Sequence, residues 1–242
     1  PQDYQAHLQA VADALRDLDP DVAVLAEVEN QNVLDDLLAE LGPEYVDSAV
    51  IDNTNDPRGI DVAAISKIPF SDVVSHMDDV FPLQGTQSPE YRFARDAVEL
   101  HLTFRGQAIV LIGVHYRSKG PPDDPNKRLA EAQRTRAIAN GLTAADPDLG
   151  VVILGDFNDL TDSPPWDAIA GADPDKYLDA ASYVPQADRW TYDFNGSLEL
   201  IDHHMANKRM QQHLDTSLVE IRHGLPTAAS DHAPMMVTYR FE

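Results

Sequence analysis

The sequence contains no cysteine, and this absence removes two kinds of site from consideration. Disulfide bonds cannot form, and no thiolate is available to bind a metal ion. The absence does not identify a cellular compartment, because it is the presence of disulfides that is tied to an oxidising environment.

Long apolar runs are absent as well, and so is the pattern of a secretion signal. No stretch of about 18 apolar residues occurs, so the sequence predicts no transmembrane helix. No basic segment followed by an apolar one is present at the start, so we expect no signal peptide within these residues. A start at Pro1 instead of Met is typical of a processed or truncated product, whose leader would lie upstream.

Basic residues are scarce: 18 lysines and arginines stand against 41 acidic residues, which gives a formal net charge of −23. Such a surface repels polyanions at long range, and no basic patch of the kind that binds nucleic acid stands out. One interpretation of the charge is solubility, including adaptation to salt. The other is that acidic groups gather around a cation site.

The 242 residues, 43% of them hydrophobic, are compatible with one large α/β domain spanning 1–242. Periodicity predicts helices over 3–18, 31–41 and 127–142. Apolar or alternating runs predict strands over 22–26, 62–65, 97–104, 108–115, 151–154, 199–206 and 234–240. Strands that alternate with helices, together with a hairpin at Gly106, favour mixed sheets over a purely parallel one.

Polar side chains stand at or just past the ends of the predicted strands. These residues are Glu27, His115, Asp156, Asn158 and Asp202. Strand ends that open on the same edge of a sheet can converge on one pocket, so the sequence predicts a site at that edge.

The segment Gly155-Asp156-Phe157-Asn158 directly follows an apolar strand. Glycine lets the backbone turn sharply, after which Asp156 and Asn158 project to the same side. A carboxylate can bind a cation or a proton, and an amide can donate a hydrogen bond to a phosphate oxygen. The structural alternative is a simple Asx turn.

The segment Ser230-Asp231-His232 precedes the last predicted strand, and a histidine beside an aspartate can be a base, an acid or a metal ligand. Asp202 lies within an apolar segment, and a buried carboxylate needs a partner. Asp202 would fix the tautomer of His232 and stabilise its imidazolium form. A surface loop for His232 and a cap for Asp202 are the alternatives. The neighbouring His203 and His204 point apart on a strand and match no zinc motif.

Three further residues suit a phosphate and its cation. Glu27 is a hard carboxylate of the kind that binds Mg²⁺, with Glu29 as the competing choice. His115 could donate to a phosphate oxygen or cap a strand end. Arg95 could grip a phosphate in a bidentate way, or form a surface ion pair with Asp96 or with a neighbouring residue.

Six motifs follow one another along nearly the whole chain: Leu25-Ala26-Glu27-Val28, Arg95, Val114-His115, Gly155-Asp156-Phe157-Asn158, Ile201-Asp202-His203 and Ser230-Asp231-His232. In this order they resemble the endonuclease/exonuclease/phosphatase superfamily, which has the deoxyribonuclease I-like fold. Two further stretches are similar to bacterial secreted nucleases within that superfamily: His115-Tyr116-Arg117-Ser118-Lys119-Gly120 and Trp190-Thr191-Tyr192-Asp193-Phe194-Asn195-Gly196.

The resemblance implies an α/β fold, a four-layer sandwich of two mixed β-sheets flanked by helices. It also implies a first core strand that ends in an asparagine. This chain starts at the helix that would follow that strand, so we expect the fold without its first strand.

The resemblance further implies hydrolysis of a phosphodiester by in-line attack of water, with Mg²⁺ as the cofactor and Mn²⁺ or Ca²⁺ as alternatives. Implied metal ligands are Glu27 and Asp231. The implied catalytic residues are His115, Asp156, Asn158, Asp202 and His232, with His232 as the base and Asp156 as the rival for that role. The implied substrate-binding residues are Arg95, Ser118 and Lys119.

A nuclease that acts on DNA or RNA, in an extracellular or periplasmic location, is the leading hypothesis from this resemblance. The acidic charge favours a phosphodiesterase or phosphatase for lipid head groups or small phosphates instead. A non-catalytic binding domain of the same fold is the third possibility. The sequence does not predict the oligomeric state.

Overall fold

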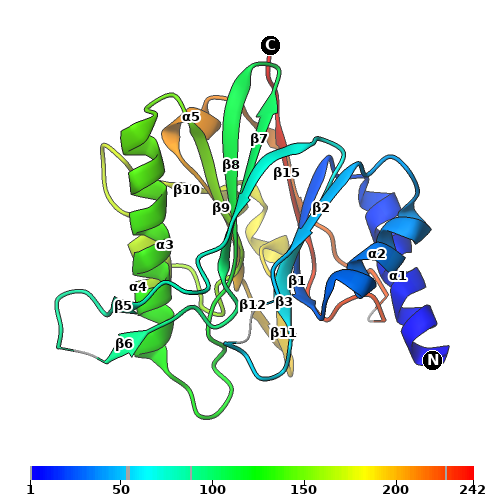
Figure 1. Cartoon of the computed structure of the whole chain (residues 1–242), viewed down its shortest axis with the longest axis horizontal. Coiled ribbons are helices and arrows are strands. Elements are labelled where there is room, and N and C mark those ends of the chain that lie inside the picture. The colour runs from blue at the N-terminus through cyan, green and yellow to red at the C-terminus, as the bar shows by residue number, and fades with distance from the viewer. Residues whose placement is uncertain (1, 53–54, 88, 227) are drawn as a thin grey trace.

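Six strands form one mixed sheet in the order β10-β13-β9-β8-β7-β4 (Figure 1). The computed structural model describes residues 2–52, 55–87, 89–226 and 228–242. Strands β8 and β9 pair in parallel because helix α3 crosses over between them, whereas the other pairs are antiparallel. The bounds are β4 Phe70–Val74, β7 Ala97–Phe104, β8 Gln107–His115, α3 Pro125–Ala145, β9 Gly150–Asp156, β10 Leu178–Asp179 and β13 Asp202–Ala206.

The other strands form smaller antiparallel sheets. Three are joined in the order β1-β3-β2, with β1 Val22–Val28, β2 Asp47–Val50 and β3 Asp61–Ser66. Three two-stranded pairs follow, namely β5 Phe81–Pro82 with β6 Glu90–Tyr91, β11 Tyr192–Phe194 with β12 Ser197–Glu199, and β14 Leu214–Ile221 with β15 Met235–Tyr239. The remaining helices are α1 Gln2–Leu18, α2 Gln31–Leu41, α4 Pro164–Ala170 and α5 Lys208–Gln211, with the short 3₁₀ helices η1 Ala180–Tyr183 and η2 Gln186–Asp188.

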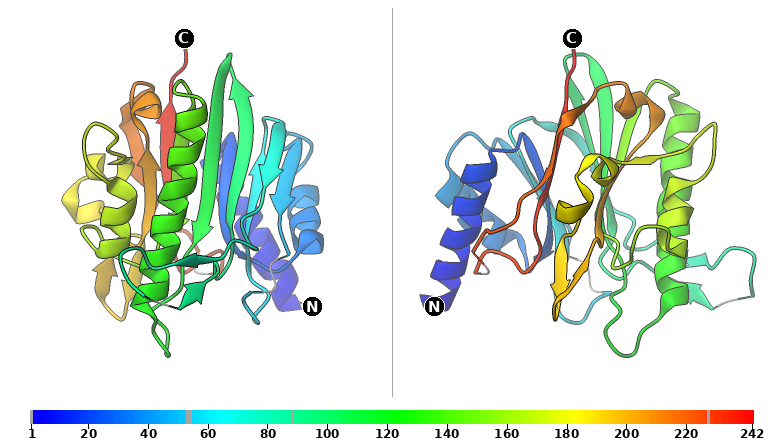
Figure 2. Two further views of the ribbon diagram at one scale, coloured as in Figure 1. Left: turned by 60° about the vertical axis from the view of Figure 1, so that its left-hand side comes forward. Right: turned by 180° about the vertical axis from the view of Figure 1, so that it is seen from behind.

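The layers are seen edge-on in Figure 2, where helices lie outside and the sheets face each other. Helices α1 and α2 cover the outer face of the β1-β3-β2 sheet, and α3 with α4 covers the outer face of the six-stranded sheet. The predicted fold class is thus confirmed: helices flank two facing layers of sheet. Parallel pairing is confined to the six-stranded sheet, so of the two layers only this one is mixed among the described strands.

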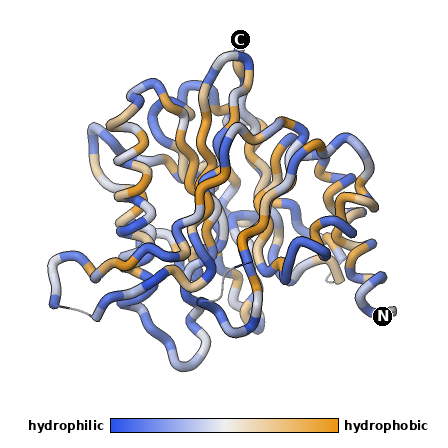
Figure 3. Tube along the Cα trace, viewed as in Figure 1, coloured by the Kyte–Doolittle hydropathy of each residue, from blue (hydrophilic) through white to orange (hydrophobic). Residues whose placement is uncertain are grey.

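Strand β3 shows how the layers fit together. All of its residues are buried, because both of its faces are covered. Val62 and Ala64 pack against Val98 of β7 in the core between the sheets, while Ala63 and Ile65 pack under α1 and α2. Apolar residues run along these strands and along the inward sides of the helices in Figure 3.

Gly113 allows the two sheets to approach closely. A Cβ atom at this position of β8 would lie 3.0 Å from Val24 of β1 and 3.0 Å from Val62 of β3. Both valines would have to shift by a few tenths of an ångström to admit a side chain here, so glycine suits this close packing. The contact joins β8 of the six-stranded sheet to β1 and β3 of the facing sheet.

The predicted elements are largely confirmed, and one predicted strand is divided. The segment 199–206 is split, since β12 ends at Glu199 and β13 begins at Asp202. Between them, the carbonyl of Ile201 accepts a hydrogen bond of 2.9 Å from the backbone N–H of Phe157. No helix of the described residues combines the length and apolar character needed to cross a membrane.

Candidate active site

Three polar residues form a row across neighbouring strands of the six-stranded sheet. In the strand register, His115 of β8 stands opposite Asp156 of β9, and Asp156 stands opposite Asp202 of β13. Residues opposite each other on paired strands project to the same face. The sheet therefore gathers these three predicted residues at one edge.

Gly155 brings Asp156 into this row. Its φ of +131° is a conformation that residues with a side chain rarely adopt, and a Cβ here would lie 2.0 Å from the carbonyl oxygen of Val114. Only glycine fits this position. The predicted need for a sharp backbone turn at Gly155 is confirmed.

Asp156 and Asn158 form the turn and a side-chain contact at the same time. The backbone N–H of Asn158 donates to Oδ1 of Asp156 at 2.6 Å, which is the Asx turn that the sequence left as the alternative. The amide Nδ2 of Asn158 also donates to Oδ2 of Asp156 at 2.9 Å. Burial raises the pKa of the Asp156 carboxyl, and the nearby charge of Asp202 raises it further.

His232 and Asp202 are hydrogen-bonded, as the sequence predicted, with 2.7 Å between Nδ1 and Oδ2. The loop that contains His232 is held beside β11 by an isolated antiparallel β-bridge between Tyr192 and His232. The ring centroids of these two residues lie 4.8 Å apart. Burial by itself would lower the pKa of His232, but the hydrogen bond and charge of Asp202 outweigh it and raise that pKa to about 9. Burial likewise opposes ionisation of Asp202, yet the bond to His232 holds the pKa of Asp202 below its usual value.

His115 is a buried, neutral imidazole. It is 4% exposed, and its Nε2 atom lies 3.4 Å from Oδ2 of Asp156. Burial lowers the pKa of His115 to about 4, so the ring is uncharged at neutral pH. Within the part of the chain that the structure describes, its Nδ1 atom has no hydrogen-bond partner.

Asp156, Asp202 and His232 form a group that could hold a metal ion, because their ligand atoms all lie within 4.8 Å of one another. The two residues that the resemblance implies as ligands, Glu27 and Asp231, are exposed and lie outside this group. Glu27 has a left-handed φ of 62° at an irregularity in the pairing of β1 with β3. Two carboxylates suit a hard divalent cation, and His232 keeps Nε2 available because only its Nδ1 atom is bonded to Asp202.

Arg95 lies behind the site and is not exposed. Its guanidinium is fully buried, with Nε 2.8 Å from Oδ2 of Asp56 and Nη1 donating to the carbonyl of Tyr116 at 2.8 Å. The surface ion pair with Asp96, the alternative from the sequence, is wrong, because Asp96 accepts hydrogen bonds from Ser75 and the backbone of His76. A buried guanidinium so engaged supports its neighbours, and direct contact with a substrate would require it to move.

Sequence reasoning missed Asp56 and Arg58. Asp56 is buried and binds Arg58, with 2.8 Å between Nη2 and Oδ2, as well as Arg95. The Arg58 side chain is 52% exposed, and its charge contributes to the lowered pKa of His115. The only signal for this pair in the sequence is an acidic and a basic residue two positions apart in a turn. Such pairs are common on protein surfaces, so the signal does not point to a site.

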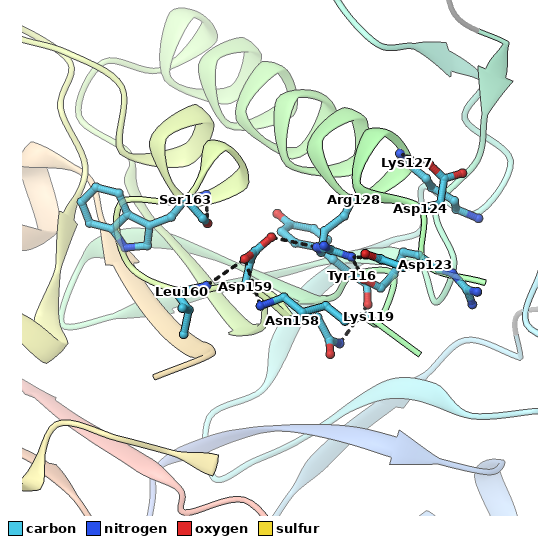
Figure 4. A network of polar contacts seen from close by, with 12 residues as sticks. Tyr116, Lys119, Asp123, Asp124, Lys127, Arg128, Asn158, Asp159, Leu160 and Ser163 are labelled. Atoms are coloured by element: carbon cyan, nitrogen blue, oxygen red, sulfur yellow. Dashed lines mark hydrogen bonds and ion pairs between the residues drawn. The ribbon is translucent and has the colours of Figure 1, made fainter. Parts of the chain in front are cut away.

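The predicted substrate-binding residues Ser118 and Lys119 lie in the loop after β8, and a polar network joins this loop to the turn that follows β9 (Figure 4). Nζ of Lys119 lies 3.2 Å from Oδ1 of Asp159, and Nε of the buried Arg128 lies 2.9 Å from Oδ2. Ser118 is half-buried and Lys119 is exposed. The loop is therefore tied to the residue that directly follows Asn158.

The two neighbouring histidines of β13 point apart, as predicted. Nδ1 of His203 lies 2.7 Å from Oδ2 of Asp179, whereas Nε2 of His204 lies 2.8 Å from the hydroxyl of Tyr239. Nε2 of His203 also lies 3.0 Å from the carbonyl oxygen of Asp159. These contacts make His203 a structural support of the turn that follows β9.

Residues 1–213 match the model of the "Endonuclease/Exonuclease/phosphatase family". Solved structures with the same fold include humanized D. rerio TDP2, with a TM-score of 0.69, 18% identity and coverage of 99% of this chain and 93% of that one. An endonuclease/exonuclease/phosphatase from Bacteroides vulgatus has a TM-score of 0.67 and 19% identity, with coverage of 99% and 92%. A mannosyl-6-phosphatase of Bacteroides thetaiotaomicron has a TM-score of 0.68 and 15% identity, with coverage of 98% and 92%. No curated protein matches the sequence.

Proposed function

This chain belongs to the endonuclease/exonuclease/phosphatase family, and we propose that it hydrolyses phosphodiester bonds with the help of a bound divalent cation, Mg²⁺ in preference to Mn²⁺ or Ca²⁺. One observation carries the proposal: Asp156, Asp202 and His232 present their donor atoms within 4.8 Å of one another. Titratable groups that converge in this way, with pKa values shifted by burial and by each other, are typical of hydrolytic sites.

Each side chain has a role that its contacts support. His232, held by Asp202 through Nδ1, takes a proton from the attacking water on Nε2, and Asp156 is the rival base. The neutral His115 donates a hydrogen bond to a non-bridging phosphate oxygen. Asn158 would do the same by exchanging its bond to Asp156 for one to the phosphate, while its other amide hydrogen stays on the Tyr116 carbonyl. A bound cation would neutralise charge on the phosphate and favour the uncharged form of His232.

Glu27 and Asp231 are the proposed ligands of the cation. Both are exposed carboxylates, and Asp231 directly precedes His232 in the chain. Oxygen ligands and several waters are the coordination that Mg²⁺ prefers. The competing ligand set is the group formed by Asp156, Asp202 and His232.

The proposed substrate is a nucleic acid strand, and the proposed place of action is extracellular or periplasmic. The stretches 115–120 and 190–196, similar to secreted nucleases, support both proposals. Lys119, Ser118 and the exposed Arg58 are the proposed phosphate contacts. The second candidate is a phosphatase or phosphodiesterase for lipid head groups or small phosphates, favoured by the net charge of −23.

A substrate panel with Mg²⁺ or Mn²⁺ tests the proposal: plasmid DNA, RNA, bis(p-nitrophenyl) phosphate, sphingomyelin and inositol phosphates. We expect cleavage of a phosphodiester that EDTA stops and Mg²⁺ restores. Asp156→Ala and His232→Ala should each abolish turnover without unfolding the protein. Metal-independent cleavage, or most activity remaining in either variant, would reject the mechanism, and no cleavage of any substrate would favour a binding domain.

A further inference from the structure

One peptide group connects the substrate loop with the catalytic turn. It joins Tyr116 to Arg117, directly after His115 at the end of β8. Its carbonyl oxygen accepts a hydrogen bond from Nδ2 of Asn158 at 3.1 Å and another from Nη1 of Arg95 at 2.8 Å. The orientation of this peptide plane therefore determines where the acceptor of the Asn158 side-chain amide lies.

The N–H of the same peptide is held from the other side by Glu131 of α3. Oε2 of Glu131 accepts the N–H of Arg117 at 2.7 Å, and Oε1 accepts the N–H of Ala94 at 2.7 Å. Glu131 is 0% exposed. One buried carboxylate thus holds two strand-end segments, one leading to Arg95 and the other following His115.

The amide of Asn158 is fixed by this arrangement. Its Nδ2 atom has two hydrogens, and they are directed to the Tyr116 carbonyl and to Oδ2 of Asp156. If the peptide rotated, the first acceptor would move away and the amide could turn over. The oxygen end would then face Asp156, and two acceptors would repel each other.

We propose that Glu131 is a positioning residue that, through the Tyr116–Arg117 peptide, fixes the orientation of the Asn158 amide. The inference rests on the proposed function for its kinetic consequence, but the contacts that carry it are independent of the substrate. Glu131 is fully buried and its two oxygens accept backbone N–H groups, so it acts through the peptide and not by touching substrate.

The charge state of Glu131 matters for this role. Burial raises the pKa of Glu131 to about 7, against the opposing effects of the two backbone N–H groups and the charges of Lys127 and Arg128. The phenol of Tyr116 also faces it, and its pKa is raised, chiefly by burial. The ionised carboxylate accepts both N–H groups, whereas the protonated form carries a hydrogen on one of the two oxygens. Positioning should therefore weaken as the pH falls below about 7.

Glu131→Gln is the main test, because it keeps the shape and removes one acceptor. We expect kcat for the best phosphodiester of the panel to fall by roughly 10- to 100-fold, with a much smaller change in KM. In the wild type, kcat should decline as the pH falls below about 7, because Glu131 becomes protonated. The variant should lack this decline. The matched control is Gln133→Ala on the same helix, which removes an acceptor for the N–H of Gln84 and should leave kcat unchanged.

A double-mutant cycle with Asn158→Ala separates positioning from general destabilisation. If Glu131 acts through Asn158, Glu131→Gln should cause little further loss of kcat in the Asn158→Ala background. Losses that multiply in the double variant would overturn the inference.

A readout without substrate keeps the inference apart from the proposed function. In the ¹⁵N spectrum, the side-chain amide signals of Asn158 should shift in Glu131→Gln and stay in place in Gln133→Ala. Unchanged signals overturn the inference, whereas a wild-type protein inactive on the whole panel overturns only the proposed function. If Glu131→Gln does not fold, Glu131→Asp, too short to hold both N–H groups, should show the same shift.

Discussion

His232 and Asp202, 30 positions apart in the sequence, are joined by a hydrogen bond of 2.7 Å between Nδ1 and Oδ2. The bond leaves Nε2 as the nitrogen free for proton transfer and places a negative charge where an imidazolium would form. It couples the loop before β15 to the first residue of β13. A histidine held in this way is prepared for acid–base chemistry.

Asp202→Asn should lower kcat by about 10²- to 10⁴-fold with little change in KM, because the charge that stabilises the His232 imidazolium is lost. Steady-state kinetics on a phosphodiester substrate measures the effect. Asp35→Asn, an exposed change on α2, serves as the control and should be silent. Retained activity in Asp202→Asn would remove the proposed acid–base role from His232.

Glu27→Gln should weaken the binding of Mg²⁺ by at least about 10-fold, since an anionic oxygen ligand is replaced by a neutral one. Isothermal titration calorimetry of the purified protein measures this. Glu29→Gln, two residues further along and also exposed, is the matched comparison and should bind normally. Loss of binding in Asp156→Asn, with normal binding in Glu27→Gln, would instead assign the ion to the group around Asp156.

Gly155→Ala should destabilise the protein by about 3 kcal/mol or more, because the new Cβ meets the Val114 carbonyl in a backbone conformation that favours glycine. Gly141→Ala in α3 is the control, since its Cβ would meet nothing within 4 Å. That change should stabilise by about 0.4–1 kcal/mol. Urea denaturation measures the free energy of unfolding of both variants. Equal values would contradict the close approach of a Cβ atom at position 155 to the Val114 carbonyl oxygen.

Arg95→Met should lower the free energy of unfolding by about 3–5 kcal/mol, because it removes the fully buried guanidinium that pairs with the buried carboxylate of Asp56. Arg58→Met removes the exposed partner of the same carboxylate and should cost less than about 1 kcal/mol. Chemical denaturation compares the two. A mild effect of Arg95→Met would show that the guanidinium is not needed behind the site.

His76 should make stability depend on pH. Its two ring nitrogens lie 2.9 Å from Asp79 and 2.7 Å from Glu99, and these bonds raise the pKa of His76 above its usual value despite burial. Burial opposes the ionisation of Glu99, but its hydrogen bonds to His76 and His101 outweigh burial and lower the pKa of Glu99. The His76 contribution is complete below its unfolded pKa of 6.5 and is lost as the pH rises through the raised value. The Glu99 contribution is present above 4.5 and is lost as the pH falls through the lowered value.

Both contributions are therefore largest together between pH 4.5 and 6.5. His76→Gln should cost roughly 1.5–3 kcal/mol at about pH 6 and clearly less at about pH 9. Denaturation at the two pH values, in wild type and variant, measures the difference. An equal loss at both would mean that the ionised form of His76 does not stabilise the fold.

Local sequence determined most of the secondary structure. The helix 31–41 was predicted and occurs as Gln31–Leu41, because its apolar stripe and its caps are local features. The turn at Gly155 was also predictable, since glycine after an apolar strand and before two Asx residues permits few conformations. The motifs likewise indicated the family, because their order along the chain is itself sequence information.

Only the tertiary structure decided which side chains meet. The register that aligns His115, Asp156 and Asp202 depends on pairing between strands far apart in the chain. The alternation of residues along one strand predicts which face a side chain is on, but not which residue of another strand lies opposite it. The burial of Arg95 against Asp56 depends in the same way on how the two loops pack. Sequence by itself therefore determined the elements and the residue types of the site, while long-range pairing and burial set its distances and charges.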